Sequence, residues 1–540
     1  MNNQSTKDKD AISTNGMAAT SHPIATEEAI RILKKGGNAV DASIAASIVL
    51  SVVEPNATSI GGDCFAIVKM EGKESVSYNG SGIAPEKLNY DFFKKNNLDK
   101  VGLTSPHSVT IPGALDAWKN IHNDSGKLDF EELFLKAIDC ARNGFKVTKV
   151  VADAWKKNEN KLLEDENSKK VFLKNSKSYN LLDIRKNIPL ADTLELISKK
   201  GISEFYQGTV GNDIVSSLNK LGGLHTMDDF AKQTTIKSST ISSNYNDNKI
   251  HQCPPNGPGI TVLIMMKLLE KLKIQNYNHN SVERFHLEAE VTKQAFKIKE
   301  ENIGDPNFIN VNLDKILSDE YIENVYKNIS IDNCSEVGDL NIPNHPETVY
   351  LSIVDKDLNS VSMINSVCYA FGSGITAEKT GIILHNRGTN FRVENGHPNC
   401  IEGLKRPLHT IIPGLVEDNK GKAILNYGVM GGQYQPVGQV HVLNSILDFN
   451  MSPQQAISSP RAFHFNNIYK LEKEISKEIK DGLSKIGHNT QYIEETHGGG
   501  QAIKIDRKNG NLIGGSDPRK DGYAEAVSYT HLTLPTKRIV

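Results

Sequence analysis

The apolar positions follow helical spacing in much of the first part of the chain. Residues 42–53 form a nearly unbroken run of small and apolar side chains between Asp41 and Glu54. A membrane-spanning helix takes roughly 20 residues, so this shorter run predicts a helix buried in the core. Residues 26–37 and 281–299 place apolar side chains every three or four positions, which predicts two amphipathic helices.

Short alternating segments dominate after residue 346, whereas residues 115–235 read as mainly helical. Alternation of apolar and polar side chains is typical of half-buried strands. Turns rich in glycine separate the segments, which predict strands at 64–68, 351–354, 360–367, 381–384 and 423–429 and helices at 441–447 and from 452. Strands with helices on both sides along the chain favour a layered α/β architecture.

Two of the predicted strands form a hairpin. Residues 349–353 and 361–363 alternate, and a polar turn at 355–359 joins them. Centring the turn on its middle residue places Thr348 opposite Ser366, and directly opposed residues have Cβ atoms roughly 5 Å apart. A shift of one residue would separate the two hydroxyls. A serine opposite a threonine is also a routine cross-strand pair, so this pair alone does not identify a site.

Thr348 gains chemistry if the peptide bond before it is cut. An internal threonine hydroxyl has no base of its own and is a poor nucleophile. Cleavage between Glu347 and Thr348 would free an α-amine that can accept the hydroxyl proton. Such an amine has an ordinary pKa of about 7.7–8.0, so much of it is neutral near physiological pH.

Charge and composition exclude several classes of function. Lysine and arginine number 62 against 64 aspartates and glutamates, a net charge of -2, so the chain lacks the basic field of a nucleic-acid-binding protein. The sixteen histidines show no HExxH spacing, the six cysteines form no CxxC pair, and no metal or other cofactor is expected. The polar N-terminal residues lack the apolar core of a secretory signal, which predicts a cytoplasmic protein with no membrane partner.

A set of short motifs, in order along the chain, resembles the γ-glutamyltranspeptidase family of N-terminal-nucleophile hydrolases. The hairpin sequence from Thr348 to Ser362 carries the resemblance, together with Phe371-Gly372-Ser373-Gly374. Further matching motifs include Gly16-Met17-Ala18-Ala19, Lys35-Gly36-Gly37-Asn38-Ala39-Val40-Asp41-Ala42, Ser108-Val109-Thr110-Ile111-Pro112-Gly113, Gly304-Asp305-Pro306-Asn307-Phe308, Lys405-Arg406-Pro407-Leu408, Pro460-Arg461 and Ser516-Asp517-Pro518-Arg519. The match runs from Gly16 to about Gly522.

The resemblance implies a precursor that cuts itself between Glu347 and Thr348. It gives an associated large fragment (1–347) and small fragment (348–540) in an α+β, four-layer αββα sandwich, with a homodimer of such pairs as one arrangement. Thr348 becomes the nucleophile. Ser366 supports it, and Gly431 and Gly432 supply backbone amides to the oxyanion.

The positions that bind the amino-acid part of the substrate depart from the family pattern. The arginine that grips the α-carboxylate is replaced by Ser81, and the aspartate that binds the α-amine by Asn390. A pair of serines becomes His409 and Thr410, and an asparagine becomes Cys368. Such a set is similar to the acylase-like members of the family, which cleave acyl amides such as the glutaryl side chains of cephalosporins.

Three of these positions allow more than one interpretation. Arg387 replaces a glutamine and is either a substitute anchor for a substrate carboxylate or a structural arginine paired with an acid. His409 either contacts substrate or packs. Cys368 fits a small packing residue better than a second nucleophile, because no histidine lies near it in the sequence.

The sequence therefore predicts a γ-glutamyltransferase or glutathione hydrolase with small-molecule amide substrates. The alternatives are an acylase of the same family and an uncleaved, inactive scaffold. We expect residues 1–15 to be disordered. Residues from about 528 to 540 match nothing before them and are interpreted as a foreign tail, a natural disordered tail being the alternative.

Overall fold

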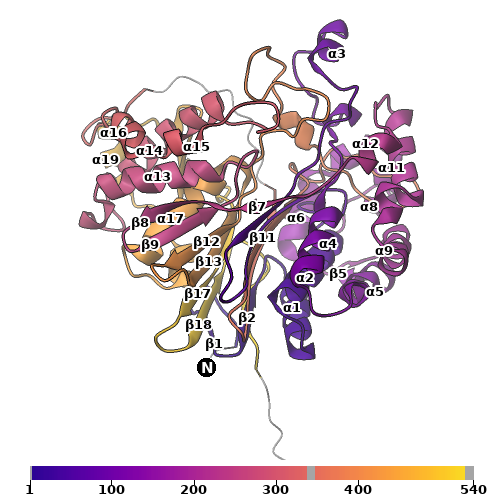
Figure 1. Ribbon diagram of the computed structural model, residues 1–540, viewed down its shortest axis with the longest axis horizontal. Coiled ribbons are helices and arrows are strands. Elements are labelled where there is room, and N and C mark those ends of the chain that lie inside the picture. Colours follow the sequence, from indigo (N-terminus) through magenta and orange to yellow (C-terminus); the bar gives the residue numbers. More distant parts are fainter. Residues whose placement is uncertain (1–2, 337–346, 529–540) are drawn as a thin grey trace, which may run out of the picture.

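The computed structural model describes residues 3–336 and 347–528. Two seven-stranded sheets lie face to face, and helices cover the outer face of each (Figure 1). This arrangement confirms the predicted αββα sandwich. A sheet with two apolar faces must bury both of them, and this arrangement covers one face of each sheet with the other sheet and the second face with helices.

The first sheet has the strand order β19-β2-β10-β11-β3-β4-β7 and contains the predicted hairpin. Every residue of its two central strands is buried, because the sheet is covered on both faces. Its strands are β2 (Gly16–Ala19), β3 (Asp63–Lys69), β4 (Val76–Gly80), β7 (Ile236–Ser239), β10 (Val349–Asp355), β11 (Ser360–Ser366) and β19 (Ala524–Ala526).

The second sheet has the order β1-β18-β17-β13-β12-β9-β8. Its strands are β1 (Ala11–Ser13), β8 (Ile241–Tyr245), β9 (Asn248–Gln252), β12 (Gly414–Asp418), β13 (Ala423–Met430), β17 (Gly499–Asp506) and β18 (Asn511–Ser516). A small sheet of β14 (Ala462–Phe465), β15 (Ile468–Glu472) and β16 (Thr490–Ile493) and a pair, β5 (Phe145–Lys146) and β6 (Ile184–Arg185), complete the strands of the described residues.

Helices from the first part of the chain cover the first sheet. The innermost is α2 (Ala39–Val53), whose fifteen residues are all buried, as the apolar run predicts. Around it lie α1 (Pro23–Lys35), α4 (Ala114–Ser125), α5 (Leu135–Asn143), α6 (Lys149–Lys157), α7 (Glu159–Leu163), α8 (Glu166–Phe172), α9 (Ile188–Lys200), α10 (Ser203–Tyr206), α11 (Thr209–Lys220) and α12 (Met227–Ala231), while α3 (Tyr90–Lys95) stands apart at the top of the view (Figure 1).

The second sheet is covered by helices from both predicted fragments. From the first come α13 (Gly259–Lys271), α14 (Val282–Asn302), α15 (Leu313–Ile316) and α16 (Asp319–Tyr326); from the second come α17 (Gln435–Leu447), α18 (Pro453–Ser458) and α19 (Lys477–Lys485). Separate apolar cores fill the space between the two sheets and the space under each helical layer. No helix within the described ranges is long and apolar enough to cross a membrane.

Three sequence predictions need correction. Residues 381–384 form only isolated bridges, from Ile383 to Thr376 and from Leu384 to Gly61, because no neighbouring strand pairs with them over several residues. The helix expected at 441–447 begins at Gln435, since a proline is tolerated in the first turn of a helix. Residues 11–13 are ordered as an edge strand paired with β18, so the expectation of disorder for residues 1–15 is wrong there. Of the predicted tail at about 528–540, residues 529–540 lie outside the described residues.

Candidate active site

The hairpin has the register that the sequence predicts. Val349 pairs with Asn365 and Val354 with Ser360 across β10 and β11. Thr348 stands directly before β10, and its Oγ1 lies 3.4 Å from the Oγ of Ser366, the last residue of β11. Both side chains are buried in the uncut chain. The strand pairing therefore brings the two predicted hydroxyls together.

The carbonyl group of Glu347 lies against both hydroxyls. Thr348 Oγ1 donates to Glu347 O at 2.5 Å, and Ser366 Oγ donates to the same oxygen at 3.2 Å. Asn56 holds the other end of this residue, because its Nδ2 lies 3.3 Å from Glu347 Oε2. Two donors on one carbonyl oxygen draw electron density from its carbon, which makes that carbon easier to attack.

Further contacts fix the orientation of the two hydroxyls. The backbone N–H of Cys368 donates to Ser366 Oγ at 2.9 Å, which leaves the serine hydrogen for the Glu347 carbonyl. Gln435, the first residue of α17, lies with its Nε2 3.4 Å from Thr348 Oγ1. Its Oε1 accepts from Ile412 N at 3.0 Å, and this contact sets which end of the amide faces the threonine.

The glycine pair lies at the turn between β13 and α17. Gly431 has φ +122° and Gly432 has φ +58°, conformations that side chains with a Cβ rarely adopt. A Cβ on Gly431 would lie 2.8 Å from the Cα of Gly498. The same turn leads into α17, whose first residue, Gln435, lies with its Nε2 3.4 Å from Thr348 Oγ1.

Asp63 joins the catalytic strand pair to the predicted substrate-binding residues. It is the first residue of β3 and pairs with Ser366 across the sheet. Its Oδ2 accepts from His385 Nδ1 at 2.9 Å and His409 Nε2 at 3.1 Å and lies 3.4 Å from Arg387 Nε. These four side chains are fully buried, with exposed fractions of 0%.

Burial and the contacts among Asp63, His385, His409 and Arg387 shift the pKa values in this cluster. Burial by itself would raise the pKa of Asp63, but His385 and His409 outweigh it and hold the pKa of this carboxyl well below its usual range. Burial, followed by the charge of Arg387, lowers the pKa of His409 to about 3. Asp63 is therefore an anion and His409 a neutral hydrogen-bond donor at physiological pH.

Arg387 lies beside an acidic residue, as its structural interpretation predicts, yet one nitrogen of its guanidinium remains available to a ligand. Its Nη1 donates to Thr410 Oγ1 at 2.9 Å and its Nε faces Asp63. Its Nη2 is buried and has no hydrogen-bond partner among the described residues. A buried charged donor without a partner is costly, so this nitrogen marks a place where a ligand oxygen would be favourable.

The remaining predicted positions lie around the same cluster. Ser81 Oγ donates to Asn79 Oδ1 at 2.7 Å, and the next residue, Gly82, donates its N–H to Asp63 Oδ1 at 3.1 Å. Asn390 Nδ2 donates to the carbonyl of Leu408 at 3.0 Å. Cys368 Sγ lies 3.9 Å from Asn390 Oδ1, and burial raises the pKa of its thiol. All six predicted binding positions therefore gather near Asp63.

Four residues at this site are absent from the sequence predictions: Asp63, His385, Gln435 and Asn56. An acidic residue at the start of an otherwise apolar strand, directly after Gly61-Gly62, is a signal that could have pointed to Asp63. His385 stands two residues before Arg387 in a stretch already singled out. No comparable signal marks Gln435 or Asn56, whose positions depend on packing between distant segments.

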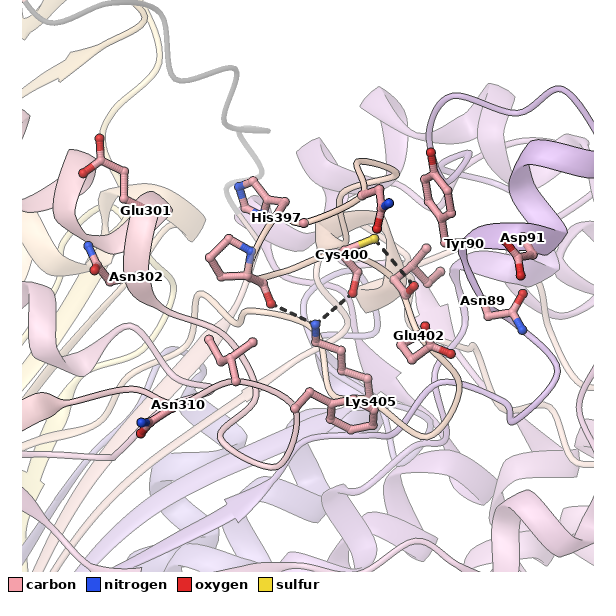
Figure 2. A pocket seen from close by; sticks show the side chains of 16 residues that line it. Asn89, Tyr90, Asp91, Glu301, Asn302, Asn310, His397, Cys400, Glu402 and Lys405 are labelled. Atoms are coloured by element: carbon pink, nitrogen blue, oxygen red, sulfur yellow. Dashed lines mark hydrogen bonds between the residues drawn. The ribbon is translucent and has the colours of Figure 1, made fainter.

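A separate open cavity of about 670 Å³ lies between the start of α3, the end of α14 and residues 395–405. Figure 2 labels wall residues from the start of α3, from the end of α14, from residues 397–405 and, in addition, Asn310. Lys405 closes part of it by donating to the carbonyls of Pro398 and Cys400 at 2.8 and 2.9 Å. None of the predicted site residues lines it.

Comparison with known proteins matches the chain to the family that its sequence motifs resemble. A model of the family described as gamma-glutamyltranspeptidase matches residues 25–527. The glutathione hydrolase-like YwrD proenzyme of Bacillus subtilis (strain 168) is 33% identical, over 96% of this chain and 100% of its own length. The glutathione hydrolase proenzyme of Escherichia coli (strain K12) is 30% identical, over 93% and 90%.

A solved structure extends the likeness to the fold. The cephalosporin acylase of Bacillus halodurans superposes with a TM-score of 0.91 at 32% identity, over 97% of this chain and 98% of that one. The family match spans nearly the whole chain, and the sandwich, the hairpin and the threonine at its start are those that the family resemblance implies. This chain is an enzyme that belongs to the gamma-glutamyltranspeptidase family of N-terminal-nucleophile hydrolases.

Proposed function

We propose that the chain cuts itself between Glu347 and Thr348 and that the freed Thr348 then cleaves amide bonds. The contact that carries the proposal is the one between Thr348 Oγ1 and the Glu347 carbonyl oxygen, 2.5 Å, with Ser366 Oγ on the same oxygen. Oγ1 is within reach of the adjoining carbonyl carbon. Its attack forms an ester, the bond from that carbon to Thr348 N breaks, and the nitrogen takes up the hydroxyl proton. Water then hydrolyses the ester and leaves a free α-amine.

Turnover repeats the same chemistry on a substrate. The α-amine accepts the hydroxyl proton, Oγ1 attacks the amide carbonyl, and the leaving amine departs with a proton. Gly431 and Gly432 are proposed to supply backbone N–H donors to the oxyanion, for which their lack of a Cβ allows a close approach. Ser366 is proposed to orient the nucleophile. Water, or an amine acceptor, resolves the acyl-enzyme.

The donor that the family favours is a γ-glutamyl compound such as glutathione. Its distal carboxylate would accept a hydrogen bond from the unpartnered Nη2 of Arg387. Ser81, His409, Thr410, Cys368 and Asn390 are proposed to shape the acyl pocket around it. Arg387→Lys keeps the charge but loses the planar donors, and we expect KM to rise about ten-fold for an acyl group with a carboxylate and to stay unchanged for one without.

A second donor class, glutaryl-type acyl amides, is favoured by one specific observation. A γ-glutamyl group also carries an ammonium, which calls for an acidic partner. Asn390 is uncharged and bonded to Leu408 O, and Asp63 is already surrounded by His385, His409 and Arg387. An acyl chain with a carboxylate and no amine would leave no charge unpaired.

Two measurements test the proposal. A denaturing gel of purified protein should show fragments of residues 1–347 and 348–540, and Thr348→Ala should show only the intact chain. Hydrolysis of γ-glutamyl p-nitroanilide and glutaryl p-nitroanilide should then be compared on the cut enzyme. Faster turnover of the glutaryl compound assigns the acylase class. An intact wild-type chain that hydrolyses neither compound would favour the scaffold alternative.

Assembly and location complete the proposal. The two fragments are proposed to stay associated, because both contribute strands to each sheet, and light scattering would test for a homodimer of such pairs. A cytoplasmic location is proposed because all six cysteines are free, which suits a reducing compartment. Cell fractionation would test it.

A further inference from the structure

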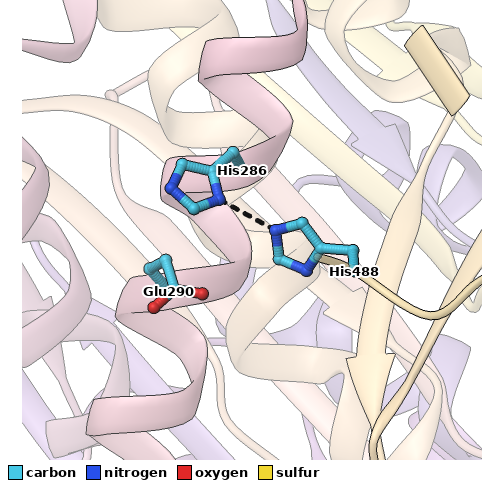
Figure 3. A group of neighbouring side chains, drawn as sticks. All are labelled: His286, Glu290 and His488. Atoms are coloured by element: carbon cyan, nitrogen blue, oxygen red, sulfur yellow. Dashed lines mark hydrogen bonds between the residues drawn. The ribbon is translucent and has the colours of Figure 1, made fainter. Parts of the chain in front are cut away.

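Three buried side chains far from Thr348 in the sequence form a group with metal-ligand chemistry (Figure 3). His286 and Glu290 stand four residues apart on α14, so they share one face of that helix. His488 comes from the turn after α19, where Gly487 takes φ +105°. One nitrogen from each histidine and one carboxylate oxygen lie within 4.8 Å of one another.

A hydrogen bond to the backbone fixes which ring nitrogen of His286 is free to bind a metal ion. Its Nε2 lies 2.9 Å from the carbonyl oxygen of Ser330, which can only accept, so the proton is on Nε2. The lone pair is then on Nδ1, which faces His488 Nε2 at 2.8 Å (Figure 3). A backbone carbonyl that holds the far nitrogen of a histidine is a recurring support for a metal-bound imidazole.

His488 can supply the second nitrogen. Its Nδ1 is buried without a hydrogen-bond partner in the described part of the chain. Moving the proton from Nε2 to Nδ1 therefore breaks no bond other than the one to His286.

The distances require only a small adjustment. Two nitrogens that each lie about 2.0–2.1 Å from a tetrahedral Zn²⁺ are roughly 3.4 Å apart. The histidine nitrogens are 2.8 Å apart, so a small rotation of the two rings would admit the ion. Glu290 accepts from three donors, namely Lys293 Nζ at 2.6 Å, Ser335 N at 3.2 Å and Ser335 Oγ. A carboxylate has about four acceptor positions, so one remains.

Lys293 decides which metal would fit. Its ammonium competes with a cation for Glu290, although Ser335 O at 2.8 Å and Cys334 Sγ at 2.9 Å also hold it. The carboxylate is therefore a weakened ligand and the imidazoles dominate. Such a donor set suits Zn²⁺, Co²⁺ or Ni²⁺ and not Mg²⁺ or Ca²⁺, which need several oxygens.

We propose that His286, Glu290 and His488 form a binding site for a divalent transition metal of the Zn²⁺ type. The ion would have a structural role, because the group contains none of the residues around Thr348. Under the proposed cleavage, His286 and Glu290 belong to the large fragment and His488 to the small one. The ion would then join the two fragments by coordination bonds. This second consequence rests on the proposed function, whereas the site does not.

The test uses untagged protein, stripped with a chelator and titrated with Co²⁺, whose visible bands report coordination, and then with Zn²⁺. Wild type and the uncut Thr348→Ala chain should each bind one equivalent. His286→Gln and His488→Gln should each weaken binding at least ten-fold. His464→Gln is the matched control, since this half-buried histidine has its ring 6.3 Å from that of His488 and is outside the group; it should bind normally.

A gain of affinity keeps the test independent of misfolding. Lys293→Met removes the competing ammonium and should bind Zn²⁺ more tightly than wild type. Zn²⁺ should also raise the Tm of wild type by about 2 °C or more and leave that of His488→Gln unchanged. Absence of stoichiometric binding in wild type, or binding that survives both histidine changes, would overturn the site. Binding by Thr348→Ala separates this result from any failure of the cleavage.

Discussion

Replacing Asp63 with asparagine removes the one negative charge among His385, His409 and Arg387. The asparagine offers a single acceptor oxygen and brings an NH₂ group among donors that now face Oδ2 at 2.9, 3.1 and 3.4 Å. Arg387 loses its counter-charge where its exposed fraction is 0%. Breaking a buried ion pair by removing one partner costs roughly 3–5 kcal/mol, and we expect a loss of that size in the free energy of unfolding.

The loss converts into a measurable change in Tm. An unfolding entropy of about 2.1 cal/mol/K per residue over 540 residues gives roughly 1.1 kcal/mol/K, so 4 kcal/mol lowers Tm by about 3–4 °C. Urea unfolding and thermal scans would measure it. The same variant should raise KM for acyl groups with a carboxylate by about ten-fold, because Arg387 is no longer held in place.

Asp517→Asn is the matched control for this experiment. Asp517 is equally buried and pairs with Arg461 at 2.6 Å. It should lose comparable stability with little change in KM. If the free energy of unfolding of Asp63→Asn lies within about 1 kcal/mol of the wild-type value, the charge cluster around Asp63 does not exist as described. If its KM is unchanged, Arg387 does not contact the acyl group.

Three further predictions concern single residues. Ser366→Ala should slow both the cut and turnover by about 100-fold, measured as fragment formation on gels and as kcat, and Ser366→Thr should restore them. Gly431→Ala should cost about 1–3 kcal/mol in urea unfolding, because its Cβ would meet Gly498, whereas Gly36→Ala, at φ +102° with open space around it, should cost less. Burial, opposed by the Ser21 hydroxyl, raises the pKa of Glu54 from 4.5 to about 7. The protonated side chain therefore contributes about 3 kcal/mol to the free energy of unfolding below pH 4.5, and this contribution is lost as the pH rises through 7. Glu54→Gln should make the free energy of unfolding less dependent on pH over this range.

The fold was predictable from the sequence because its main signals are local. The apolar run at 42–53 could only be a buried helix, and alternation on either side of a five-residue turn set the register that brings Thr348 to Ser366. Residues 381–384 show the limit of such patterns. An apolar stretch becomes a strand only if a neighbouring strand supplies a ladder of hydrogen bonds, and here the chain makes single bridges.

The partners of each site residue depend on segments that the sequence does not connect. Arg387 could be identified as a charged residue in the pocket region, but its pairing with Asp63 joins positions 324 residues apart. The contact of Gln435 with Thr348 likewise depends on how α17 begins, and the Pro436 next to it argues against a helix there when read alone. Position along the chain identifies candidate residues, whereas packing decides which atoms of each are still available to a ligand.

The central claim is that Thr348 becomes an N-terminal nucleophile. Intact mass measurement and N-terminal sequencing of purified wild-type protein test it most directly. The account predicts two associated chains, residues 1–347 and 348–540, with threonine as the first residue of the smaller one and amide hydrolysis only after the cut. Active protein that remains a single chain, or a cut at another bond, would contradict it.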